Sequence, residues 1–346
     1  MTDSRASAVE TIARDPLWLP HRYDPGYDAI HYLRLDRAQH DALTFLIDSE
    51  LPAGLDKLVL ERALSVGAAA SGAAPLHFIF HSAYCCSTLL ARAFNQPGIA
   101  MGLKEPTIFN DIVGWRRRGA GPQRVAAVLS DVMTLLAQPF ATGEAVIAKP
   151  SNVLNGLAMP ILAMRPETHA LLLHAPLPVY LASIAKKGMW GALWVREHFR
   201  GALKDGIVQL GFQADDYLGQ TDLQIAAAGW LAQHAVFEAV VKRFGPGRVR
   251  TLDSDTLLAR KGEALAALSR LFGLAMTREQ TDAIADGPIF ARHSKFATPF
   301  GAGQREREHE ALPASQREEI EKVTVWAEAV AAHAGIPLQL GAPLLD

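Results

Sequence analysis

Short apolar runs alternate with helical stretches over most of this chain. LHFIFH (76–81), AVIAK (145–149) and HALLLH (169–174) predict buried strands, and RVRTL (248–252) predicts a fourth. Apolar residues at helical spacing predict helices over 87–94, 123–138, 153–164, 178–187, 225–244 and 313–334. Strands that alternate with helices indicate βαβ units. We therefore expect an α/β fold with a doubly wound, mainly parallel sheet flanked by helices.

Residues 1–75 follow a different pattern. Tyr and Trp residues stand among Asp and Pro, which predicts an irregular extension with one or two short helices. The small-residue stretch GAAASGAAP (67–75) is typical of a link. We expect an N-terminal extension over 1–75 that packs on a main α/β domain over 76–346.

Composition narrows the class of protein. The chain has 346 residues, of which 49% are hydrophobic, and a net charge of −2. The hydrophobic content is enough for a packed core, and the near-neutral net charge excludes general electrostatic binding to nucleic acid. The apolar stretches stop short of the roughly 18 residues that a membrane span needs, and the N-terminus lacks the pattern of a secretory signal. The two cysteines are adjacent, so no disulfide framework exists. We expect a cytoplasmic protein.

The turn HSAYCCST (81–88) lies where a doubly wound sheet binds ligands, at the carboxyl end of its first strand. Helix-start N–H groups and the hydroxyls of Ser87 and Thr88 suit an anion there. Of the Walker pattern GxxxxGK[ST] only Thr88 agrees, because Ser87 stands at the lysine position. This argues against a kinase or ATPase. A turn that binds no phosphate, with the cysteines as small buried residues, is the alternative.

The run FIFHSAYCCSTLLARAF, followed by LKEP (103–106), resembles the sulfotransferases that use 3′-phosphoadenosine 5′-phosphosulfate (PAPS). Their loop commonly reads [PKR]-[RK]-S-G-T-T-L-L. Here Tyr84 takes the basic position, and Cys85 and Cys86 take the Ser and Gly positions. The resemblance implies a P-loop NTPase-like fold and a donor-binding loop made of Ser82, Tyr84, Cys85, Cys86, Ser87 and Thr88. Because Tyr84 carries no charge, another cation must replace the missing one, and Lys104 and Lys295 are the candidates.

The resemblance also implies two catalytic residues. Glu105 follows Tyr84 by 21 residues, near the distance at which tyrosylprotein-type sulfotransferases carry their general base. Lys149 ends the strand 145–149, where the family's lysine contacts the sulfate oxygens and offsets charge on the leaving phosphate. The alternatives are that Lys104 and Glu105 form a solvated surface pair and that Lys149 extends to the surface.

Two further sites would hold the nucleotide. The family's third strand ends in an Arg, with a Ser eight residues later, and both bind the 3′-phosphate. Here His174 and Ser183 stand nine residues apart, and the neighbouring Lys186 and Lys187 are further sources of charge. The late basic loop 291–308 carries Ser294 and Lys295, which by resemblance close over the nucleotide, with Arg305 or Arg307 in support. A structural histidine and a solvated loop are the alternatives.

The sequence thus predicts a bacterial-type sulfotransferase-like enzyme that needs no metal. PAPS would be the co-substrate, and the acceptor would be a hydroxyl or amine of a small molecule or peptide. The substituted loop keeps a second hypothesis open, a catalytically inactive binding or scaffold protein of the same fold. A P-loop kinase is a third, which the absent Walker lysine disfavours.

Overall fold

The computed structural model describes residues 9–291 and 310–346. Its main sheet has five strands in the order β5-β6-β4-β7-β8. These strands are β4 (Leu76–His81), β5 (Ala100–Lys104), β6 (Ala145–Lys149), β7 (Ala170–His174) and β8 (Val249–Asp253). The first of them in the chain, β4, lies between β6 and β7, so the later connections lead to both sides of it. This is the doubly wound, mainly parallel α/β arrangement that we predicted.

The sequences of these strands explain the parallel pairing. Every residue of β4, β5 and β6 is buried, as expected for parallel strands that are covered on both faces. β6 pairs in parallel with β4 on one side and with β5 on the other. The carboxyl ends of these strands therefore meet at one edge of the sheet, where the topology places a binding site.

The predicted strands and helices are present with small shifts of their ends. The predicted helices correspond to α4 (Ser87–Ala93), α6 (Pro122–Leu136), α8 (Leu177–Ala185), α10 (Asp222–Phe244) and α16 (Ala314–Ala334). The expected helix at 153–164 is divided into a 3-10 helix, η2 (Asn152–Leu157), and α7 (Ala158–Met164). The remaining helical elements after residue 75 are α5 (Thr107–Arg117), α9 (Gly188–Lys204), η3 (Ala214–Gly219), α11 (Ser254–Ala259), α12 (Lys261–Leu271), α13 (Arg278–Asp286) and α14 (Pro288–Ala291). None of the helices in the described ranges combines the length and apolarity needed to cross a bilayer.

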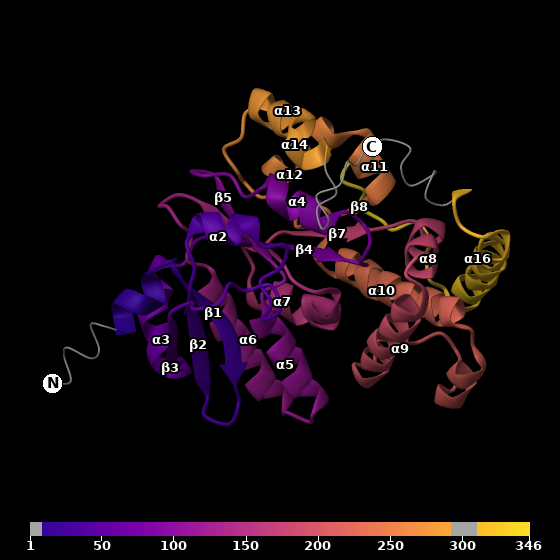
Figure 1. The fold of residues 1–346 in the computed structure, drawn as a ribbon, viewed down its shortest axis with the longest axis horizontal. Coiled ribbons are helices and arrows are strands. Elements are labelled where there is room, and N and C mark those ends of the chain that lie inside the picture. Colours follow the sequence, from indigo (N-terminus) through magenta and orange to yellow (C-terminus); the bar gives the residue numbers. More distant parts are fainter. Residues whose placement is uncertain (1–8, 292–309) are drawn as a thin grey trace. The chain divides into compact units, whose positions relative to one another are not determined.

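The N-terminal segment contains more regular structure than its sequence indicates. β1 (Trp18–Asp24), β2 (Ala29–Arg34) and β3 (Lys57–Glu61) form an antiparallel sheet in that order (Figure 1). The short helices α2 (Arg37–Ala42) and α3 (Arg62–Ala69), with the 3-10 turn η1 (Ala70–Gly72), agree with the expected short helices. The sheet was not expected, because a register shift between Pro20 and Arg22 interrupts the alternation that identifies a strand.

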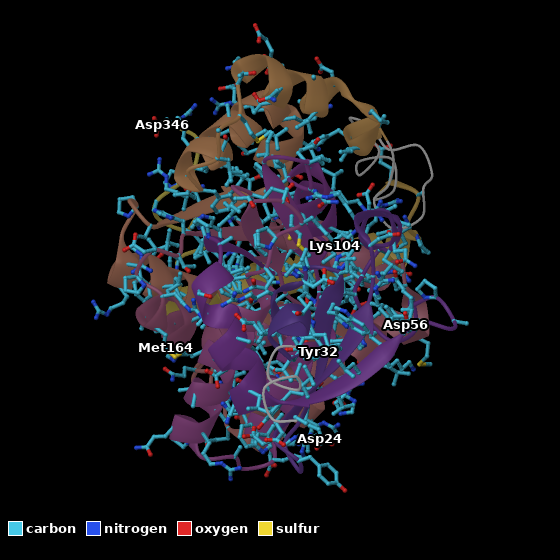
Figure 2. The ribbon with its side chains drawn as sticks, turned by 90° about the vertical axis from the view of Figure 1, so that its left-hand side faces the viewer. Asp24, Tyr32, Asp56, Lys104, Met164 and Asp346 are labelled. Atoms are coloured by element: carbon cyan, nitrogen blue, oxygen red, sulfur yellow. The ribbon has the colours of Figure 1, made fainter. Side chains whose placement is uncertain are left out.

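Contacts divide the chain into two compact units, which we describe separately. Unit 1 comprises Met1–Phe80, Thr88–Ala170 and Ser269–Thr277, and unit 2 comprises His81–Ser87, Leu171–Leu268 and Arg278–Asp346. Unit 1 has a core in which Phe78 stacks on Phe80 and contacts Phe109. Figure 2 shows Tyr32 and Lys104, two of the largest fully buried side chains of this unit. The core of unit 2 is built around the buried faces of α8 and α10.

Candidate functional site

The loop between β4 and α4 has a strained backbone. Ala83, Tyr84 and Cys86 have φ angles of 71°, 52° and 65°, in the left-handed region that favours glycine. None of the loop residues 82–88 is a glycine. Each such residue costs on the order of 1 kcal/mol, and strain of this kind is concentrated at functional sites. The conformation therefore persists only because other contacts fix the loop.

Those contacts join the loop to the end of β7. The Ser82 N–H donates to the Leu173 carbonyl at 3.0 Å, and the Ser82 hydroxyl accepts from the Ala175 N–H at 3.1 Å. The Cys85 thiol points at the same Leu173 carbonyl, with a sulfur–oxygen distance of 3.5 Å. Ser82 and Cys85 are fully buried. Their side chains therefore hold the loop in place, and the buried side chains of Ser87 and Thr88 follow at the start of α4.

The Tyr84 side chain lies among aromatic residues of the same unit. Its ring centroid is 5.9 Å from that of Tyr180 and 5.6 Å from that of Trp194. Burial raises the pKa of the Tyr84 hydroxyl, so this side chain is neutral at neutral pH. The Lys187 ammonium lies over the Tyr84 ring, 5.6 Å from the centroid. A cation is thus present beside Tyr84.

Glu105 and Lys149 form an ion pair in unit 1. Lys149 is the last residue of β6, Glu105 follows β5 directly, and the Glu105 N–H donates to the Lys149 carbonyl at 2.7 Å. The Lys149 side chain is 1% exposed and the Glu105 side chain 19%. The Lys149 ammonium also lies 5.1 Å from the ring centroid of Phe45, a neighbour that sequence reasoning did not identify. The alternative in which Lys149 extends to the surface is therefore wrong.

Lys104 makes a different set of contacts. It is fully buried, and its ammonium donates to the carbonyls of His40 at 2.7 Å and Asp41 at 3.1 Å, at the end of α2. Desolvation by burial, together with the nearby Arg92 charge, lowers the pKa of Lys104 to about 8. The last carbonyls of a helix lack partners within it, and Lys104 satisfies two of them. The alternative of a solvated Lys104–Glu105 surface pair is wrong.

His174 and Ser183 belong to unit 2. His174 ends β7, and its ring lies 5.0 Å from that of His234, which is fully buried. Burial lowers the pKa of His174 to about 4 against the opposing effect of Asp253, so the imidazole is neutral at pH 7. The Ser183 hydroxyl donates to the Val179 carbonyl at 2.8 Å within α8. Both roles in phosphate binding stay predictions.

The structure groups the predicted residues by unit. Glu105 and Lys149 are brought together in unit 1, to which Thr88 and Lys104 also belong. Unit 2 holds the loop residues 82–87 together with His174 and Ser183. The candidates Ser294 and Lys295, with the supporting Arg305 and Arg307, lie outside the described residues. In the ranges that are described, no three His, Cys, Asp or Glu side chains gather as metal ligands would.

Comparisons with known proteins give little beyond this geometry. No family model matches the chain, and no curated protein matches it. Among solved structures, the chain is similar to the "Sulfotransferase Domain from the Curacin Biosynthetic Pathway", with 10% sequence identity and a TM-score of 0.42. That similarity covers 77% of this chain and 99% of the other. At this TM-score the likeness carries no functional conclusion, so the function must be argued from the residues themselves.

Proposed function

We propose that this chain is a sulfotransferase-like enzyme that transfers a sulfuryl group from PAPS to a hydroxyl or amine of a small-molecule or peptide acceptor. The observation that carries the proposal is the Glu105–Lys149 ion pair at the carboxyl ends of β5 and β6. A carboxylate that can act as a base and a cation, at the carboxyl ends of parallel strands, suit this transfer.

Glu105 has the properties of a general base in this reaction. Its carboxylate is partly exposed, so an acceptor hydroxyl can approach it. In the transfer, the sulfur–oxygen bond to the donor phosphate breaks, and a bond forms between sulfur and the acceptor oxygen or nitrogen. The acceptor proton passes to Glu105, and the donor leaves as 3′,5′-adenosine bisphosphate. A positioned base contributes about 100- to 10,000-fold to the rate of such a step.

Lys149 supplies a cation whose side chain is almost completely buried. A buried ammonium is costly unless an opposite charge compensates it, and Glu105 is that partner. Negative charge that develops on the leaving phosphate would give Lys149 a second partner. A charge placed in advance stabilises the transition state without reorganisation. The expected result is that Lys149 contributes to both donor binding and turnover.

The donor would be bound by the strained loop. Its conformation is fixed by β7, and the Ser87 and Thr88 side chains begin the following helix. We keep His174, Ser183, Ser294 and Lys295 as proposed contacts to the nucleotide on the resemblance alone. Lys104 has the weaker case as a donor-binding cation, because its ammonium already donates to two carbonyls. We propose no metal in the reaction.

The test is binding of 3′,5′-adenosine bisphosphate, which is measured by thermal unfolding and by calorimetry. At about 100 times its dissociation constant a ligand adds about 2.7 kcal/mol to the free energy of unfolding. We expect this gain with the bisphosphate, a smaller one with adenosine 5′-monophosphate, and transfer of sulfate from PAPS to an acceptor detected by mass spectrometry. If millimolar bisphosphate does not raise the melting temperature, the enzyme hypothesis is wrong and the scaffold hypothesis is left. Stabilisation by Mg²⁺-ATP alone would indicate a kinase.

A further inference from the structure

Lys187 contacts Tyr84, in the loop between β4 and α4 that we call the donor loop, and further aromatic side chains. Its ammonium lies 5.6 Å from the ring centroid of Tyr84 and 5.0 Å from that of Trp190. Trp194 contacts both rings, at 5.6 Å from Tyr84 and 6.4 Å from Trp190. We call these four residues the Lys187 cluster. All of them belong to unit 2, so the cluster is a property of one compact unit.

The backbone around Lys187 is held in a tight turn between α8 and α9. The Lys187 N–H donates to the Ile184 carbonyl at 2.9 Å, and Gly188 follows with a φ of +53°. A side chain at Gly191 would collide with the Ile184 carbonyl, so only glycine allows α9 to pass this close to α8. Lys187 is half-buried at the start of α9. The turn therefore fixes the position from which its side chain reaches Tyr84.

We propose that Lys187 supplies the positive charge of the donor loop and binds the phosphosulfate group of PAPS, in place of the basic side chain that Tyr84 has replaced. This inference rests on the proposed function. An aromatic face attracts an ammonium through its quadrupole. Tyr84 in this role is a positioning residue, which orients the lysine toward the loop. The loop thus keeps a cation, although the residue that carries it comes from another part of the chain.

The first test compares lysine variants at the two ends of α9. Lys187→Met removes the charge and keeps an unbranched side chain, Lys187→Arg keeps the charge, and Lys204→Met removes an exposed charge at the other end of the helix. By calorimetry with 3′,5′-adenosine bisphosphate, we expect Lys187→Met to raise the Kd by about 10- to 100-fold. Lys187→Arg and Lys204→Met should stay within about twofold of the unmodified protein. An equal effect of Lys187→Met and Lys204→Met would overturn the inference.

The second test is a rescue that a merely structural lysine would not show. Tyr84→Lys, introduced together with Lys187→Met, returns a cation to the loop at the position where the resembling family carries one. We expect the double variant to bind the bisphosphate at least about tenfold more tightly than Lys187→Met alone. A Kd no lower than that of Lys187→Met, in a double variant whose melting temperature shows it folded, would count against a charge role.

The outcomes separate this inference from the proposed function. If the unmodified protein binds the bisphosphate and Lys187→Met binds it equally well, the sulfotransferase proposal stands and Lys187 has no part in it. If the unmodified protein does not bind the bisphosphate at millimolar concentration, both proposals are wrong. If Lys187→Met lowers the melting temperature and leaves the Kd unchanged, the Lys187 cluster is a packing feature only.

Discussion

Glu105 and Lys149 are joined twice, once through the backbone and once through their side chains. The Glu105 N–H donates to the Lys149 carbonyl at 2.7 Å, and the Lys149 ammonium pairs with the Glu105 carboxylate. Glu105 adopts a φ of +55°, a strained conformation for a residue other than glycine. The strand register brings Lys104 opposite Lys149, so Glu105 is the first residue beyond the paired segment. The backbone of Lys149 thus fixes the position of the carboxylate that its own ammonium contacts.

This double link makes Glu105→Gln a sharp test of the proposed base. The amide has the size of the carboxylate, and its oxygen can still accept from Lys149, but it cannot take a proton from the acceptor. We expect turnover with PAPS to fall by about 100-fold or more. The Kd for 3′,5′-adenosine bisphosphate should change by less than about threefold, because no contact to the nucleotide is removed. An unchanged turnover rate would exclude Glu105 as the base.

Lys149→Ala should weaken both donor binding and turnover. The substitution removes the cation that we place beside the donor phosphate, and it leaves the Glu105 carboxylate without its partner. We expect the Kd for the bisphosphate to rise by about tenfold and turnover to fall further than in proportion. Lys57→Ala, at an exposed position of β3 in the same unit, is the control with an equal change of charge. A fall in turnover with an unchanged Kd would restrict Lys149 to the chemical step.

Strands could be predicted from the sequence where both faces are buried, because almost every residue of such a strand is apolar. β4 and β6 are apolar along almost their whole length, and their bounds match the predicted ones. β5 was missed, because its five residues include Gly102 and end in Lys104, and so carry no clear pattern. Gly102 is there for packing, since a Cβ at this position would lie 2.6 Å from the Ala91 carbonyl oxygen. Such a close approach is a tertiary fact that a single sequence does not contain.

The same limit applies to the candidate site. Glu105 and Lys149 were identifiable separately, each by its place in a motif or at a strand end. Their ion pair depends on the parallel register of β5 and β6, and β5 was not predicted. The contact of Lys187 with Tyr84 joins segments far apart in the chain, and neither residue has a local signal for it. Candidate residues could therefore be identified one by one from the sequence, whereas the contacts between them could not.

Lys104→Met separates a structural role from donor binding. The variant removes the donor to the carbonyls of His40 and Asp41 and leaves them buried without that partner. We expect the free energy of unfolding, measured by urea denaturation, to fall by about 1–3 kcal/mol. The Kd of the folded variant for 3′,5′-adenosine bisphosphate should stay within about threefold. A tenfold increase in that Kd would instead return Lys104 to the donor site as the cation that replaces the charge missing at Tyr84.

His40 makes the stability of the protein depend on pH. Its imidazole is 1% exposed, neither ring nitrogen has a hydrogen-bond partner in the described part of the chain, and burial lowers its pKa to about 3. As the pH falls below the ordinary histidine value of 6.5, the unfolded chain takes up a proton that the folded chain refuses. The free energy of unfolding should therefore decline by about 1.4 kcal/mol per pH unit for this group.

His40→Phe tests this dependence, because the new ring keeps an aromatic contact with Phe140 and has no group to titrate. Urea denaturation between about pH 7 and about pH 5 should give a shallower decline than in the unmodified protein, by about one proton. Near pH 7 the variant should be at least as stable, since it no longer buries two ring nitrogens without partners. Parallel curves for the two proteins would show that His40 titrates alike in the folded and unfolded chains, and the role of burial assigned to it would be wrong.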